Sequence, residues 1–353
     1  MKIALITDTH FGARSDSVQF DNFFRKFYDE VFFPYLVNND ISTIVHLGDV
    51  FDRRKFINYT TLHNCRQYYF EQIKKLGLQL YQIVGNHDTY FKNTNEVNSL
   101  GLIAADYAVD TIVSEPKEII FDGCSVLMVP WLCADNYVAA SAVIEKSCAP
   151  VCFGHFELAG FQMYKGMVNE HGMKPGVFDK FDLVCSGHFH HRSTKGNITY
   201  LGNPYEITWS DYDDPRGFHV FDTDTLDLAF VENPNTIFIK YYYDDKLHDP
   251  DAFDTSLFNQ RYVKVIVINK TDFYKFDRFI DRIYIAAPLE LKIIEDFSEF
   301  EADALEDTTV DIEDTMSLLS DFVDVIETDM DRPKIKSMLK KLYIEAQQAG
   351  DAA

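Results

Sequence analysis

The chain has 353 residues and a formal net charge of −23 at pH 7, so it is long enough for one large core and one or two smaller units. The negative charge argues against a broad basic groove, so binding to a polyanion would need metal ions, local basic residues or a partner. The N-terminal strand runs into a polar motif at Asp8 too soon for a signal peptide, and no apolar run approaches the ~18 residues of a membrane span. We therefore expect a cytoplasmic protein without membrane association.

Polar residues follow five predicted β-strands, each at the point where the strand ends. Strands over residues 2–7, 42–47, 78–84, 151–153 and 181–185 end in Asp8-Thr9-His10, Gly48-Asp49, Gly85-Asn86-His87-Asp88, Gly154-His155 and Gly187-His188-Phe189-His190. In an open α/β sheet, ligands bind at the carboxyl ends of the strands. Asp8 and His10, two positions apart on an extended segment, would point the same way. The five strand ends therefore predict one shared site.

These strand ends supply carboxylate, imidazole and amide donors, a mixture that suits a pair of divalent transition-metal ions. The donors belong to Asp8, His10, Asp49, Asn86, His155, His188 and His190. Two ions ~3.5–4 Å apart can lower the pKa of a bridging water and hold a phosphoryl oxygen for in-line attack. The carboxylate of Asp49 is suited to span both ions. Any single histidine of this set would be interpreted as an ordinary core or loop residue, but seven donors in five such turns favour a metal centre.

The remaining pattern predicts amphipathic helices and a change of organisation near Pro234. Helices are expected at residues 17–37, 58–76, 95–105 and 139–145, and a hairpin joins residues 118–121 to 125–130 through Asp122-Gly123. The pattern of residues 261–294 predicts a strand, a helix and a second strand, and this segment contains none of the donor motifs. We therefore divide the chain into a catalytic domain (1–235), a small capping domain (236–294), an acidic linker (295–331) and a C-terminal amphipathic helix (332–349).

The linker and the helix differ sharply in charge. Residues 295–331 contain fifteen acidic residues and no lysine or arginine. The apolar face of the following helix includes Ile335, Met338, Leu339 and Leu342. This face would dock either onto the body of the protein or onto a partner protein.

Several other side chains admit two interpretations. Tyr90, Phe91 and Trp209 could stack on a base or pack beside the site. The aromatic run Tyr68-Tyr69-Phe70 could pack on the sheet or form a dimer contact, and His191 could be exposed or support the metal motif beside it. His46 lies within a predicted strand and is expected in the core.

The motifs D-x-H, G-D-x-x-D-R, G-N-H-D, G-H and G-H-x-H occur in this order over residues 1–235 and resemble those of the calcineurin-like metallophosphoesterase superfamily. The resemblance implies an α/β fold with a β-sandwich flanked by helices. It also implies that Asp8, His10, Asp49 and His190 hold one ion, and that Asp49, Asn86, His155 and His188 hold the second. His87 would then lie over the phosphate and stabilise the transition state or protonate the leaving oxygen.

Within the superfamily, the chain looks most like the nuclease subunit of the Mre11/SbcD family, including its phage members. The features that carry this likeness are the G-H-F-H motif, the stretch Tyr200-Leu201-Gly202-Asn203-Pro204-Tyr205-Glu206, and a small domain followed by a tethered helix. The resemblance implies a manganese-dependent, homodimeric DNA nuclease that docks its C-terminal helix on a Rad50/SbcC-like ABC-type ATPase. It would act as an exonuclease on duplex ends and an endonuclease on single strands in double-strand break processing and recombination, in the host cytoplasm if phage-encoded.

One position departs from this pattern. Asp52 stands where some members of the family carry a second histidine, and the related protein phosphatases have an aspartate there that hydrogen-bonds the G-N-H histidine. We therefore expect Asp52 to orient His87 and raise its pKa, and Arg53 to contact phosphate. A phosphatase or cyclic-nucleotide phosphodiesterase of the same fold is the alternative function. A non-catalytic scaffold is disfavoured because none of the expected ligands is missing.

Overall fold

The computed structural model describes residues 1–103 and 110–295. A first six-stranded sheet has the order β14-β13-β1-β2-β3-β4. Its strands are β1 (Lys2–Ile6), β2 (Thr43–His46), β3 (Gln79–Ile83), β4 (Thr111–Val113), β13 (Gly217–Asp222) and β14 (Leu228–Glu232). The pairs β1–β2, β2–β3 and β3–β4 are parallel, so the carboxyl ends of β1, β2 and β3 lie at one edge of the sheet.

A second six-stranded sheet has the order β11-β12-β10-β7-β6-β5. Its strands are β5 (Lys117–Phe121), β6 (Cys124–Val129), β7 (Val151–His155), β10 (Leu183–Gly187), β11 (Ser193–Lys195) and β12 (Ile198–Tyr200). The predicted hairpin at Asp122-Gly123 is confirmed, and both turn residues have positive φ. The strands β7 and β10 are parallel, so His155 and the G-H-F-H motif also share an edge.

The two sheets pack face to face through a buried apolar layer. The first sheet contributes side chains such as Leu5, Val45 and Ile83, and the second contributes Val126 and Phe153. Alternate residues of β1 and β2 point to the opposite face, where they pack against helices, as in the buried pair Ala4 and Ile44. The predicted β-sandwich flanked by helices is confirmed.

The helices on the outer face of the first sheet form two long runs. The first consists of α2 (Val18–Phe27), η1 (Tyr28–Phe32) and α3 (Phe33–Asn38), and the second of α4 (Tyr59–Cys65), η2 (Arg66–Phe70) and α5 (Glu71–Leu76). Both agree with the predicted helices to within one or two residues. Tyr68, Tyr69 and Phe70 are almost fully buried in this layer, so their aromatic character serves packing.

Shorter elements complete this part of the chain. They are α1 (Ala13–Asp16), α6 (Ser99–Ile103), α7 (Tyr137–Lys146), β8 (Gln162–Tyr164), β9 (Met167–Val168), and 3₁₀ turns at Pro175–Phe178 and Trp209–Asp211. The helix α7 agrees with the prediction, whereas α6 begins four residues after the predicted start. The outer face of the second sheet, with Val129 and Cys152, packs against Ile144 of α7 and against Phe178 and Phe181.

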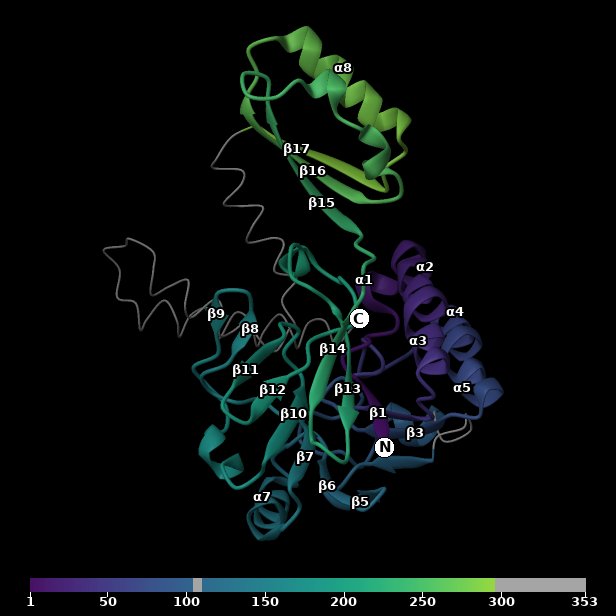
Figure 1. Cartoon of the computed structure of the whole chain (residues 1–353), viewed down its shortest axis with the longest axis vertical. Helices are drawn as coiled ribbons and strands as arrows, with labels where there is room; N and C mark the ends of the chain where they lie inside the picture. Colours follow the sequence, from purple (N-terminus) through teal and green to yellow (C-terminus); the bar gives the residue numbers. More distant parts are fainter. Residues whose placement is uncertain (104–109, 296–353) are drawn as a thin grey trace, which may run out of the picture. The chain divides into compact units, whose positions relative to one another are not determined.

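Residues 238–294 form a separate three-stranded parallel sheet with its own apolar cluster. The sheet consists of β15 (Phe238–Asp244), β16 (Tyr262–Asn269) and β17 (Glu290–Ile294), and α8 (Phe273–Ile285) packs on one face (Figure 1). The predicted strand-helix-strand is present, and the sequence analysis missed β15. Trp209 packs on Phe238 with ring centroids 4.5 Å apart, which favours packing over base stacking for this tryptophan.

The acidic linker and the C-terminal helix, with Ile335, Met338, Leu339 and Leu342, lie outside the described residues apart from Glu295. The division into domains therefore stays a prediction. Over residues 1–103 and 110–295, no helix combines the length and apolar character needed to cross a bilayer.

Candidate metal centre

The edge shared by β1, β2 and β3 faces the corresponding edge of β7 and β10, and the two sheets are linked there by His155. Its ring Nδ1 donates a hydrogen bond of 2.8 Å to the carbonyl oxygen of Leu47. Two glycines allow this close approach. A Cβ at Gly48, whose φ is +106°, would lie 2.6 Å from His155 Nδ1, and a Cβ at Gly187 would lie 2.1 Å from Thr7 Oγ1.

The backbone at the donor residues is not extended, so the predicted conformation of residues 8–10 is wrong. Asp8, His10 and Asp49 have φ values of 51°, 42° and 57°, which non-glycine residues rarely adopt. The segment is held there because the amides of Asp8 and His10 donate to the carbonyls of Gly48 and Asp49 at 3.0 and 3.1 Å. Strained backbone of this kind is concentrated at functional sites.

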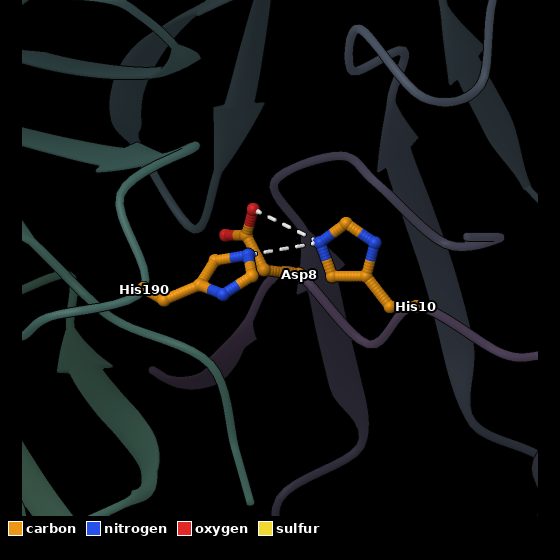
Figure 2. A group of neighbouring side chains, drawn as sticks. All are labelled: Asp8, His10 and His190. Carbon is orange, nitrogen blue, oxygen red and sulfur yellow. Dashed lines mark hydrogen bonds and ion pairs between the residues drawn. The ribbon is translucent and has the colours of Figure 1, made fainter. Parts of the chain in front are cut away.

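One group of possible metal ligands consists of Asp8, His10 and His190 (Figure 2). The Nε2 atoms of His10 and His190 are 3.0 Å apart, and Asp8 Oδ1 lies 3.9 Å from His10 Nε2. The Asp8 carboxylate is fixed by the Thr7 hydroxyl at 2.6 Å and by the amide of His188 at 3.1 Å. Carboxylate and imidazole donors that converge in this way suit a divalent transition metal.

A second group consists of Asp49, His155 and His188, and the side chain of Asn86 joins it. Asn86 Oδ1 lies 2.8 Å from His155 Nε2 and 3.0 Å from His188 Nδ1. His155 Nε2 also lies 3.3 Å from Asp49 Oδ2. Because His155 Nδ1 donates to Leu47, its Nε2 is the nitrogen that is left to act as a ligand.

Asp49 lies between the two groups. Its Oδ2 is 3.3 Å from His155 Nε2 and 3.9 Å from His10 Nε2, while its Oδ1 accepts the amide of His87 at 2.8 Å. The structure therefore brings together all seven predicted donors, with the carboxylate of Asp49 in the shared position.

His87 lies beside His10, with ring centroids 4.8 Å apart and planes at 89°. Its Nδ1 donates a 2.6 Å hydrogen bond to the backbone carbonyl oxygen of Asp52. The Asp52 carboxylate lies 3.6 Å from His10 Nδ1. The structure thus shows a contact between the two residues through the Asp52 backbone, and the predicted effect of the Asp52 carboxylate on the pKa of His87 stays a prediction.

Arg53 forms an ion pair with Asp16, with 2.8 Å between Nη1 and Oδ2, and its guanidinium lies over the ring of Phe56. Its predicted contact with phosphate stays a prediction. The next residue, Arg54, donates from Nη1 to Thr89 Oγ1 at 3.1 Å, and so connects the loop after β2 to the loop after β3.

The buried carboxylates favour positive charge in this centre. Burial opposes ionisation of Asp49, but the imidazoles of His155 and His87 outweigh it and hold its pKa well below the usual range. Burial lowers the pKa of His155, whereas the nearby Asp49 and Asp8 carboxylates raise it, and the balance is a pKa of about 9. A site that draws protons onto a fully buried imidazole is also one that would attract divalent cations.

Asp88, the last residue of the G-N-H-D motif, is a supporting residue to which the sequence analysis assigned no role. Its buried carboxylate accepts the amides of Asp49, Gly85 and Val50 at 2.8, 2.9 and 3.0 Å. Burial and the neighbouring Asp49 raise its pKa to about 7. It fixes the turn that carries Asp49, and its signal in the sequence was its place in a strand-terminal motif.

A buried arginine, Arg216, holds the backbone of the G-H-F-H motif at His190. Arg216 donates to the backbone carbonyl of His190 and to Asn203 Oδ1, and its Nη2 pairs with Asp214 at 2.6 Å and Asp211 at 3.0 Å. His191 Nδ1 lies 2.7 Å from the same Asp214 carboxylate. Of the two interpretations of His191, this contact favours the supporting role.

The fold and the donors define a class of protein. Residues 1–136 match the family model for calcineurin-like phosphoesterases. The chain is also 32% identical, over 99% of its length and 100% of the relative's, to exonuclease subunit 1 of Enterobacteria phage T4. The chain therefore belongs to the calcineurin-like phosphoesterase family, as its motifs predicted, and it is a metal-dependent phosphodiesterase.

Two solved structures show more distant similarity. One is a novel archaeal phosphodiesterase, which is 15% identical with a TM-score of 0.35. The match covers 66% of the present chain and 100% of the archaeal chain. The other is a protein of unknown function from Aquifex aeolicus, which is 16% identical with a TM-score of 0.25. The match covers 56% of the present chain and 82% of the Aquifex chain.

Proposed function

We propose that the protein is a two-metal DNA nuclease. The observation that carries this proposal is the carboxylate of Asp49, which lies between two groups of metal donors at the edges of both sheets. A two-metal site is suited to in-line displacement at a phosphodiester. DNA is proposed as the substrate because the near-full-length relative is an exonuclease subunit.

In this proposal Asp8, His10, Asp49 and His190 hold one ion, and Asp49, Asn86, His155 and His188 hold the other. When bound, two divalent ions such as Mn²⁺ supply an activated water and Lewis-acid stabilisation of the phosphoryl oxygens. Asp49 holds the two halves of the site together. His155, oriented by its hydrogen bond to Leu47, presents Nε2 to the centre.

His87 is proposed as the catalytic residue that acts on the leaving group. Its Nδ1 proton is donated to the Asp52 carbonyl, so in this proposal its Nε2 carries a second proton and delivers it to the leaving oxygen. Arg53 is proposed as an auxiliary phosphate contact, which would require it to share or leave Asp16.

Replacing His87 by alanine should retain the metals and reduce DNA cleavage by about 10²- to 10⁴-fold, because a general acid is lost while all seven donors remain. The assay is release of nucleotides from end-labelled duplex and single-stranded DNA with Mn²⁺ or with EDTA. Metal content is measured on the same preparations. Wild-type activity in the variant would remove His87 from the mechanism. If the wild type released no nucleotide but hydrolysed a small phosphomonoester with Mn²⁺, the phosphatase alternative would replace the nuclease.

The biological setting is proposed from the family resemblance and from the relative's description as a subunit. The protein would act as an exonuclease on duplex ends and an endonuclease on single strands, as a homodimer in double-strand break processing. Its partner would be a Rad50/SbcC-like ABC-type ATPase, bound through the apolar face of residues 332–349.

Truncation after Asp331 should abolish capture of the ATPase partner and leave basal nuclease activity in place, because the donor residues all lie before residue 191. Leu339→Glu should weaken capture as strongly as the truncation, whereas Lys340→Glu on the polar side should have little effect. A pull-down with the tagged ATPase subunit distinguishes these variants. Equal capture by wild type and Leu339→Glu would contradict the proposed contact.

A further inference from the structure

Two large aromatic side chains are exposed directly after the G-N-H-D motif. Tyr90 and Phe91 are 42% and 48% exposed, and their rings form an edge-to-face pair with centroids 4.7 Å apart. Neither ring has a place in the proposed chemistry. Exposed aromatic rings next to a candidate metal centre suit a ligand that presents a π-face.

The segment that carries these rings is firmly anchored. The amide of Tyr90 donates to the carbonyl of Val97 at 2.9 Å, and Thr89 pairs with Asn98 in a short β-bridge. Inside this loop the almost fully buried Asn95 donates to the carbonyl of Trp131 at 2.8 Å, and Asn98 donates to the carbonyl of Asn95 at 2.9 Å. Because the loop is already ordered, binding of a ligand to the rings would cost little conformational entropy of the protein.

The same loop is continuous with the metal centre. Thr89 Oγ1 donates to the carbonyl of Asn86 at 3.0 Å and accepts from Arg54 at 3.1 Å. Arg54 belongs to the basic run Arg53-Arg54-Lys55, and Lys92 follows the aromatic pair. Arg53 is paired with Asp16 at 2.8 Å, so Arg54 is the cation that the structure places on this loop. An arginine beside exposed rings suits a ligand that combines phosphates and π-faces.

We infer that Tyr90 and Phe91 form a stacking platform for an unpaired base of the DNA strand next to the scissile phosphate. This inference rests on the proposed nuclease function. It adds that the enzyme prefers unpaired nucleotides at the cleavage position. A base in a duplex already has its faces covered by its neighbours, whereas a base in a single strand or a frayed end exposes a face to an aromatic side chain. The platform therefore selects strands that are open at the cleavage position.

The test compares oligonucleotides with and without a base. Single-stranded substrates are prepared with a normal nucleotide or an abasic residue on either side of one cleavable position, and kcat/KM with Mn²⁺ is measured for each. In the wild type, removal of the stacked base should lower kcat/KM by about 5- to 150-fold. In the double variant Tyr90→Ala/Phe91→Ala, cleavage of the normal strand should fall by a similar factor, and the normal and abasic strands should be cut equally.

Two further variants sharpen the comparison. Tyr90→Phe/Phe91→Tyr keeps both rings and should keep the preference for the strand that has the base. Phe273→Ala/Tyr274→Ala removes two rings of α8 that are 67% and 73% exposed, and it should also keep that preference. This control separates the platform from a general effect of removing exposed aromatic side chains.

Three outcomes would overturn the inference. The first is a double variant that still distinguishes the normal strand from the abasic one as well as the wild type does. The second is a change in oligomeric mass of the double variant, measured by sedimentation, with unchanged cleavage of single strands, which would make the rings a contact between protein copies. The third is a wild type that cleaves no DNA although it hydrolyses a small phosphodiester with Mn²⁺. Only this third outcome would also overturn the proposed nuclease function.

Discussion

Replacing Asp49 by asparagine should lower phosphodiester hydrolysis by about a thousandfold or more and reduce the amount of bound metal. The substitution keeps one oxygen that can accept the amide of His87 but removes the negative charge that lies 3.3 Å from His155 and 3.9 Å from His10. Lewis-acid stabilisation of developing charge by bound metal ions is worth several kcal/mol, and in this proposal it depends on the Asp49 carboxylate to hold both ions. The neutral amide cannot bridge two cations in the same way.

The measurements are kcat on a phosphodiester substrate and the metal content per protein chain after dialysis against Mn²⁺. Asp40→Asn is the matched control because Asp40 is exposed and follows α3, away from the donor groups. Thermal unfolding of both variants checks that the fold is retained. A variant Asp49→Asn with full metal content and a wild-type rate would refute the bridging role and, with it, the two-metal proposal.

Replacing Arg216 by alanine should lower the free energy of unfolding by about 3–5 kcal/mol, because it leaves the buried carboxylates of Asp211 and Asp214 without their shared cation. It also removes the donor to the carbonyl of His190, so affinity for metal should fall by about 10- to 100-fold. Arg216→Lys should recover little of either property, because one ammonium cannot reproduce the forked contacts of the guanidinium.

Urea unfolding followed by circular dichroism gives the stability, and titration with Mn²⁺ gives the metal affinity. Arg192→Ala is the matched control. Arg192 is exposed, and its guanidinium lies over the ring of Phe230 at 4.2 Å, so its loss should cost about 1 kcal/mol or less. If Arg216→Ala proved as stable as Arg192→Ala and bound metal equally well, the role assigned to the buried cluster would be wrong.

Local patterns in the sequence determined where most of the helices and strands of this protein lie, because secondary structure depends mainly on neighbouring residues. Apolar runs with a polar turn at the end located β1, β2, β3, β7 and β10, and helical spacing of aromatic residues located the helices over residues 18–38 and 59–76. The residue types at those turns were sufficient to predict which polar side chains lie together, because parallel strands bring their carboxyl ends to one edge. The shorter strands β4 and β11 were missed because three residues carry too little periodicity, and β15 was missed because its aromatic run has no clear alternation.

Tertiary structure alone decided how the predicted residues meet. The left-handed backbone of Asp8, His10 and Asp49 results from hydrogen bonds between two loops forty residues apart, so the sequence pattern of an extended strand could not show it. The same holds for the contact of His87 with the backbone carbonyl of Asp52, and for the link between Arg216 and His190. Residue types and their order fix which chemistry is available, whereas the partners of each buried polar group are set by the packing of segments distant in the chain.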